Sequence, residues 1–137
     1  MRFLLDTNVI SELSKLQPDS SVAIRYARNI EEIAIASVTW HELLYGFHRL
    51  PDSRKKESLN VFLHQTIRSN IAIFNYDEAA AEWFADERSR LTRLGQTPSY
   101  ADGQIAAIAK VNDLILVTRN VSDYVNFTQL NIENWFD

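Results

Sequence analysis

The 137 residues include 14 Lys and Arg and 18 Asp and Glu, for a formal net charge of −4, and 46% of them are hydrophobic. This composition excludes a disordered or fibrous chain, and the negative charge excludes nucleic-acid binding through overall charge alone. Because the chain has no Cys, disulfides, thiolate zinc sites and cysteine catalysis are excluded as well. The length predicts one domain over residues 1–137.

Short apolar runs alternate with segments of helical periodicity along the chain. Strands are predicted at residues 2–5, 32–37, 70–74 and 114–118, with a short fifth at 129–133. Helices are predicted at 9–16, 21–30, 39–50, 53–69, 77–94 and 99–111, and Gly95 is predicted to cap the fifth. This order predicts an α/β fold in which helices flank a central parallel sheet of about four to five strands.

Only a short apolar run precedes Asp6, and no window approaches the roughly 20 apolar residues of a membrane span. We therefore expect a cytoplasmic protein.

Acidic residues follow or flank the predicted strands at positions that share one edge of the sheet. Asp6 ends the first strand, and Thr118, Asn120 and Asp123 follow the fourth. Two further acids lie near the starts of helices, namely Glu42 after the second strand and Asp102 before the fourth. Because ligands of parallel sheets bind at the carboxyl ends of the strands, we expect the four acids to converge on one crevice.

Helix capping explains each of these acids taken singly. Asp6 suits the start of a helix near Asn8, and Asp123 suits a turn. The segments "TWHE" (39–42) and "SYAD" (99–102) both have the spacing of a capping box. Their joint placement favours function instead, because clustered carboxylates repel one another unless a cation or a proton is present. Such oxygen-rich clusters suit Mg²⁺ or Mn²⁺.

Four segments together, "LLDTNVISEL", "ASVTWHELLYGFHRL", "SYADGQIAAIAK" and "LILVTRNVSDY", resemble the PIN-domain ribonucleases of the VapC toxin type, in particular the FitB-like branch. The resemblance implies a single PIN-like domain whose nuclease activity depends on Mg²⁺ or Mn²⁺. It implies Asp6, Glu42 and Asp102 as metal-binding and catalytic acids. The fourth acidic position falls in the family either at the place of Asn120 or at that of Asp123; the resemblance favours Asp123, with Thr118 and Asn120 as polar neighbours.

In the mechanism that the resemblance implies, Asp6 and Asp102 hold the ion, and Glu42 reaches it directly or through water. The ion activates a water molecule against an RNA phosphodiester. The resemblance also implies partners: a cognate VapB-like antitoxin that neutralises the nuclease, a second copy in a homodimer or a larger toxin–antitoxin assembly, and DNA only through the antitoxin. Of the basic residues, Arg90 and Arg93, and Lys55 and Lys56, are candidates for RNA contact, although such runs also form ordinary solvated faces.

The sequence leaves open the role of one aromatic cluster and whether the chain is an enzyme. The aromatic residues of 40–47 suit core packing, a dimer interface or a groove for an antitoxin helix. The chain as a whole also suits a non-enzymatic PIN-like subunit that binds an antitoxin in a DNA regulatory complex and has little or no nuclease activity. Metal-dependent RNA cleavage distinguishes this alternative from the enzyme.

Overall fold

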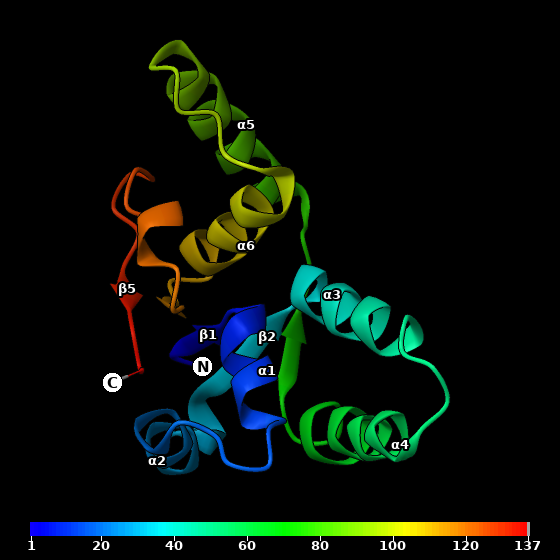
Figure 1. Cartoon of the computed structure of the whole chain (residues 1–137). Coiled ribbons are helices and arrows are strands. Elements are labelled where there is room, and N and C mark those ends of the chain that lie inside the picture. Colours follow the sequence, from blue (N-terminus) through cyan, green and yellow to red (C-terminus); the bar gives the residue numbers. More distant parts are fainter. Residues whose placement is uncertain (137) are drawn as a thin grey trace.

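The computed structural model describes residues 1–136 and contains a five-stranded sheet in which all paired strands are parallel. The order across the sheet is β3-β2-β1-β4-β5, so β1 is central and pairs with both β2 and β4 (Figure 1). The strands are β1 (Phe3–Leu5), β2 (Ile33–Ala36), β3 (Ala72–Phe74), β4 (Ile115–Val117) and β5 (Ile132–Glu133). The predicted α/β fold with a parallel sheet is confirmed, including its short last strand.

Six α-helices connect and cover the strands, joined by short 3₁₀ turns and one π-helical segment. The α-helices are α1 (Thr7–Leu13), α2 (Ser20–Arg28), α3 (Ser37–His48), α4 (Arg54–Val61), α5 (Glu78–Arg93) and α6 (Tyr100–Val111). The 3₁₀ segments are η1 (Ile30–Glu32) and η3 (Val121–Asp123), and the π-helical segment is η2 (Phe62–Ile67). Among residues 1–136, no helix has the length and apolar character needed to cross a membrane.

Alternation along β1 produces two cores, one on each face of the sheet. Leu4 belongs to the core that α5 and α6 cover, whereas Phe3 and Leu5 belong to the core beneath α1 to α4. All three side chains are buried, which is typical of a central strand in a sheet covered on both faces. Figure 1 shows α5 and α6 together, well separated from α2 and α4.

Two glycines have backbone roles in this arrangement. Gly95 adopts a φ of +72° just after α5, and Gln96 N donates to Leu91 O at 2.8 Å, which confirms the predicted glycine cap. Gly103 lies where α6 meets α5, and a Cβ atom there would overlap the ring of Phe84. The close approach of α5 and α6 therefore requires a glycine at this position.

One predicted helix differs from the structure. Residues 53–69 were expected to form one α-helix, but α4 ends at Val61 and the chain continues as η2. The wider turns are visible in the hydrogen bond from Arg68 N to Leu63 O at 2.8 Å. No Pro or Gly marks the change, and Leu63 and Ile67 are buried at a spacing that an α-helix also produces. The apolar pattern therefore did not distinguish the two helix types.

Candidate active site

Asp6 lies at the carboxyl end of the central strand, directly beside the end of β4. Its backbone N donates to Val117 O at 2.8 Å, and the hydroxyl of Thr118 donates to Asp6 Oδ2 at 2.9 Å. Asp6 is only 6% exposed, and Thr118 is fully buried. The pairing of β1 with β4 thus joins the two segments that the sequence predicted to share a crevice.

The Asp6 carboxylate also caps α1, so capping and a site role coexist in one residue. Oδ1 accepts from Thr7 N at 2.8 Å, and Oδ2 accepts from Asn8 Nδ2 at 3.1 Å as well as from Thr118. Burial raises the pKa of Asp6, the hydrogen bonds from Thr118, Thr7 N and Tyr124 oppose the rise, and the charge of Glu42 adds to it. The folded protein therefore disfavours a negative charge here in the absence of a cation.

Asp102 approaches Asp6 from the first turn of α6. Its backbone N donates to Ser99 Oγ at 3.1 Å, which is half of the predicted capping box. The returning bond to the Asp102 side chain is not found, and Asp102 Oδ1 instead accepts from the hydroxyl of Tyr124 at 3.2 Å. Burial raises the pKa of Asp102, hydrogen bonding to the Ser99 and Tyr124 side chains opposes the rise, and the charges of Asp123 and Asp6 add to it.

Tyr124 links the two aspartates, a connection that the sequence did not predict. Its hydroxyl lies 3.2 Å from Asp6 Oδ2 and 3.2 Å from Asp102 Oδ1, although it carries only one proton to donate. The residue is 1% exposed, so its ring packs in the core while its hydroxyl meets two carboxylates. Burial, together with the charges of Asp6 and Asp102, strongly raises the pKa of Tyr124 and keeps the phenol protonated.

Glu42 reaches the same crevice from α3, the helix that follows β2, as its position in the sequence predicted. The proposed capping box with Thr39 is wrong, because α3 already begins at Ser37 and Thr39 is fully buried inside it. Glu42 Oε1 accepts instead from Thr7 Oγ1 at 2.7 Å. A residue of the first turn of α1 thus fixes the carboxylate that α3 supplies.

These acids line one pocket of about 440 Å³, which we call the acid pocket. Four acidic and two basic side chains line it, together with polar residues. The acids are Asp6, Glu12, Glu42 and Asp102, the cations are Lys15 and Arg119, and Asn120 is among the polar residues. The predicted convergence of Asp6, Glu42 and Asp102 is therefore confirmed as a matter of geometry.

The structure places Asp123, the residue favoured for the fourth acidic position, beside Asp102 but outside the acid pocket. Asp123 is exposed at the end of η3 and lines a separate pocket on the other side of Asp102, whereas Asn120 lines the acid pocket. The turn explains the difference, because it directs Tyr124 into the core and leaves the preceding residue outside. Asp123 still acts on the pocket at a distance by raising the pKa of Asp102.

The carboxylates of the acid pocket are the donor atoms available to a divalent ion. Within residues 1–136, no three acidic or histidine side chains are grouped closely enough to hold one ion. Asp6 and Asp102 nevertheless fit a hard cation, since both pKa values are raised and Mg²⁺ in proteins commonly uses one or two carboxylates with several waters. Asp6 and Asp102 would therefore hold such an ion together, and the ion would supply charge neutralisation and water activation at the pocket.

The predicted RNA-contacting cations lie in different surroundings. Arg90 donates from Nε and Nη2 to Glu87, each at 3.0 Å, and from Nη2 to Asn126 O at 2.8 Å. Arg93 donates to Ser89 Oγ at 2.8 Å. Lys55 lines an apolar groove beside α4, and Lys56 lies 5.2 Å from the ring centre of Phe47. Arg90 is therefore held by hydrogen bonds to other residues of the chain.

The match to a family model decides the family: the PIN domain model covers residues 3–122. The chain is a PIN-domain protein. Among curated relatives, toxin FitB of Neisseria gonorrhoeae is 34% identical over 137 residues, covering 98% of this chain and 99% of the relative. The tRNA(fMet)-specific endonuclease VapC of Shigella flexneri is 32% identical over 135 residues, covering 98% of each.

Solved structures agree with the PIN-domain assignment over the whole fold. The structure of FitAB bound to an IR36 DNA fragment matches with a TM-score of 0.88 and 30% identity, covering 96% of this chain and 94% of that one. The DNA-bound VapBC of Salmonella typhimurium matches with a TM-score of 0.87 and 29% identity, covering 98% of each chain. This PIN domain is therefore close to the VapC and FitB toxins of toxin–antitoxin systems.

Proposed function

We propose that this PIN-domain protein is a metal-dependent endoribonuclease toxin, encoded with an antitoxin that neutralises it in the cytoplasm. The observation that carries the proposal is the pair of aspartates, the buried Asp6 and the partly buried Asp102, whose carboxylates both accept from the Tyr124 hydroxyl at the edge of the acid pocket. Relatives named ribonuclease or endonuclease VapC support the activity. We further propose that residues 1–137 form one domain and that two copies associate as a dimer.

Asp6 and Asp102 would hold Mg²⁺ or Mn²⁺ through their carboxylates. When bound, such an ion neutralises charge on a phosphodiester and lowers the pKa of water. Thr7 keeps Glu42 at the pocket wall, where its carboxylate can accept a proton from a water molecule or orient that water. Arg119 lines the same pocket and can balance the charge of an entering phosphate, whereas Lys15 on the pocket wall already pairs with Glu12 at 2.8 Å. Thr118 and Asn8 restrain Asp6 Oδ2, so the carboxylate keeps its orientation.

The partner is proposed from the structural neighbours, which are complexes of toxins with antitoxins, some bound to DNA. An apolar groove of about 260 Å³ between α1, α3 and α4 opens beside the acid pocket and shares Thr7 and Glu42 with it. Phe47 and Leu59 line this groove, whereas Trp40 packs on His64 and Tyr45 stacks on His41. We propose that an antitoxin segment lies in the groove and carries a cationic side chain into the acid pocket.

RNA cleavage by the purified protein tests the enzyme against the binding-subunit alternative. We expect cleavage only with added Mg²⁺ or Mn²⁺, and loss of cleavage in Asp6→Asn. The matched control is Asp113→Asn, since Asp113 is exposed beyond the far end of α6 and its φ of 56° suits Asn. A wild-type protein without metal-dependent turnover would support the partner-binding subunit instead. Addition of antitoxin should abolish cleavage, and equal rates with and without it would contradict neutralisation.

A further inference from the structure

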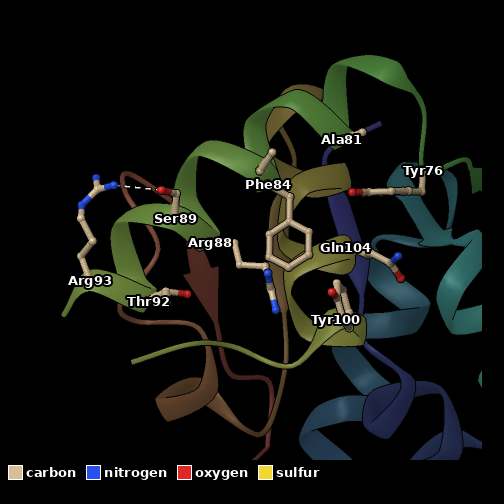
Figure 2. Close-up of a pocket in the computed structure, with 10 residues that line it drawn as sticks. Tyr76, Ala81, Phe84, Arg88, Ser89, Thr92, Arg93, Tyr100 and Gln104 are labelled. Atoms are coloured by element: carbon tan, nitrogen blue, oxygen red, sulfur yellow. Dashed lines mark hydrogen bonds between the residues drawn. The ribbon is translucent and has the colours of Figure 1, made fainter. Parts of the chain in front are cut away.

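A second pocket with its own lining lies between α5 and α6, away from the paired aspartates. This α5–α6 pocket has a volume of about 580 Å³ and is drawn in Figure 2. Its lining includes Tyr76, Phe84, Arg88, Arg93, Tyr100 and Gln104. Figure 2 shows Phe84, Arg88, Tyr100 and Gln104 gathered between the two helices, with Arg93 near the far end of α5. Neither the paired aspartates nor the proposed reaction explains this cavity.

The charge of the α5–α6 pocket is opposite to that of the acid pocket. Its lining contains two arginines and no acidic residue, whereas four acids and two cations line the acid pocket. The whole chain has a net charge of −4, so a polyanion needs a local concentration of positive charge in order to bind. The α5–α6 pocket provides such a concentration.

Arg88 lies in this pocket with hydrogen-bonding capacity to spare. Its Nε atom is buried, and no acceptor for it is found among residues 1–136. Its guanidinium carbon lies 4.7 Å from the ring centre of Tyr100, so the cation packs on an aromatic face and not on a carboxylate. A buried donor without an acceptor is unfavourable, and a ligand with anionic oxygens would satisfy it.

Tyr100 connects the two pockets through the first turn of α6. It precedes Asp102 by two residues, so one helical turn carries the aromatic ring at the α5–α6 pocket and the carboxylate at the acid pocket. The ring is 64% exposed, although it also contacts Phe84 edge-on. Exposed aromatic rings beside arginines are typical of sites that stack the bases of single-stranded nucleic acid.

We infer that the α5–α6 pocket binds the RNA strand beside the phosphate that is cut. Arg88 donates to a backbone phosphate, Tyr100 stacks on a base, and Gln104 offers its amide to the same nucleotide. Single-stranded RNA fits better than a second copy of this chain, because the lining combines the Arg88 guanidinium, whose Nε has no acceptor among residues 1–136, with an exposed aromatic ring. This inference rests on the proposed ribonuclease function, since it treats RNA as the substrate.

RNA binding measured without divalent ions separates this inference from the cleavage chemistry. The probe is a fluorescently labelled single-stranded RNA, and anisotropy gives its Kd over a range of salt concentrations. Arg88→Gln is compared with Arg28→Gln, which makes the same charge change on the exposed surface of α2. We expect Arg88→Gln to reduce the slope of log K against log salt by about 0.7–1, and Arg28→Gln to leave it near the wild-type value.

Tyr100→Leu is the second variant, and we expect it to raise the Kd at least about fivefold through lost stacking. In cleavage assays both pocket variants should raise KM and leave kcat near the wild-type value. If Arg88→Gln and Arg28→Gln have the same Kd and salt slope, the inference is overturned even when the wild type cuts RNA. If the wild type cuts no RNA, the proposed function fails. Dissociation of a dimer by Arg88→Gln with unchanged RNA affinity would assign the pocket to a contact between copies and overturn the inference.

Discussion

Asp102→Asn distinguishes a metal-binding carboxylate from a helix cap at the start of α6. The cap bond is donated by the backbone N of Asp102 to Ser99 Oγ, so the substitution leaves it intact. An Asn oxygen can still accept from the hydroxyl of Tyr124. The substitution removes the negative charge of the Asp102 carboxylate, a group whose pKa is raised by burial and by the charges of Asp123 and Asp6. At neutral pH the metal-free variant should therefore melt at the wild-type temperature or above it.

The magnitudes follow from the size of the chain. A protein of 137 residues has an unfolding entropy of about 0.29 kcal/mol/K, so 1 kcal/mol shifts Tm by about 3.5 °C. Loss of a cap costs about 0.5–2 kcal/mol, or about 2–7 °C, and Ser99→Ala should show that loss. Binding of Mn²⁺ at a hundredfold excess over Kd contributes about 2.7 kcal/mol, or about 9 °C, to the wild type.

The assay is thermal melting of wild type, Asp102→Asn and Ser99→Ala with and without Mn²⁺, run beside RNA cleavage. We expect Ser99→Ala to melt lower and keep its response to Mn²⁺, and Asp102→Asn to lose both that response and cleavage. If Asp102→Asn melts lower, responds normally to Mn²⁺ and still cuts RNA, the carboxylate is not a metal ligand and the reasoning is refuted.

Three further substitutions test other parts of the structure. Tyr124→Phe keeps the buried ring but removes the hydroxyl shared by the two aspartates, so the Kd of the protein for Mn²⁺, measured by calorimetry, should rise about 10-fold. The control is Tyr26→Phe, which removes a buried hydroxyl that has no partner among residues 1–136 and should leave this Kd unchanged. Glu87→Gln should lower the free energy of unfolding by about 2 kcal/mol at pH 7. Hydrogen bonding to Arg90 lowers the pKa of Glu87, so this stabilisation is present above about pH 4.5 and is lost as the pH falls through the folded-state pKa. Urea titrations measure the difference in unfolding free energy between wild type and Glu87→Gln, and an equal difference at pH 7 and pH 3 would argue against this account. Gly103→Ala should cost about 1–3 kcal/mol by overlap with Phe84, and an unchanged Tm would show that α5 and α6 separate without strain.

Much of the site was predictable because the sheet is parallel. Apolar runs separated by helices imply parallel strands, and parallel strands bring the residues after β1 and β4 to one edge. Asp6 and Thr118 therefore lie together, as the sequence indicated. Glu42 and Asp102 were found through their positions near helix starts. The spacing from Thr39 to Glu42 suggested a capping box, but Glu42 accepts from Thr7 instead. A capping box and a helix interior can have the same residue pattern, so spacing alone does not distinguish them.

The remaining features depend on the path of the chain after β4. Whether Asn120 or Asp123 faces the pocket is determined by η3, a three-residue turn whose direction the residue pattern does not specify. The same turn buries Tyr124 between two aspartates that are distant from it in sequence. Likewise, the Glu87 carboxylate accepts hydrogen bonds from Arg90 on its own helix and from Thr128 in the loop before β5. The bond from Thr128 could not be predicted from sequence spacing, because it joins segments that meet only in the folded chain.

Electron paramagnetic resonance of Mn²⁺ most directly tests the central claim that Asp6 and Asp102 hold the ion that cleavage requires. Free and bound Mn²⁺ are measured while the wild type, Asp6→Asn, Asp102→Asn and the control Asp113→Asn are titrated. The account predicts saturable binding in the wild type and in Asp113→Asn, and at least about a 10-fold loss of affinity in each pocket variant. Equal binding by the wild type and by Asp6→Asn, or no saturable binding by the wild type, would contradict it.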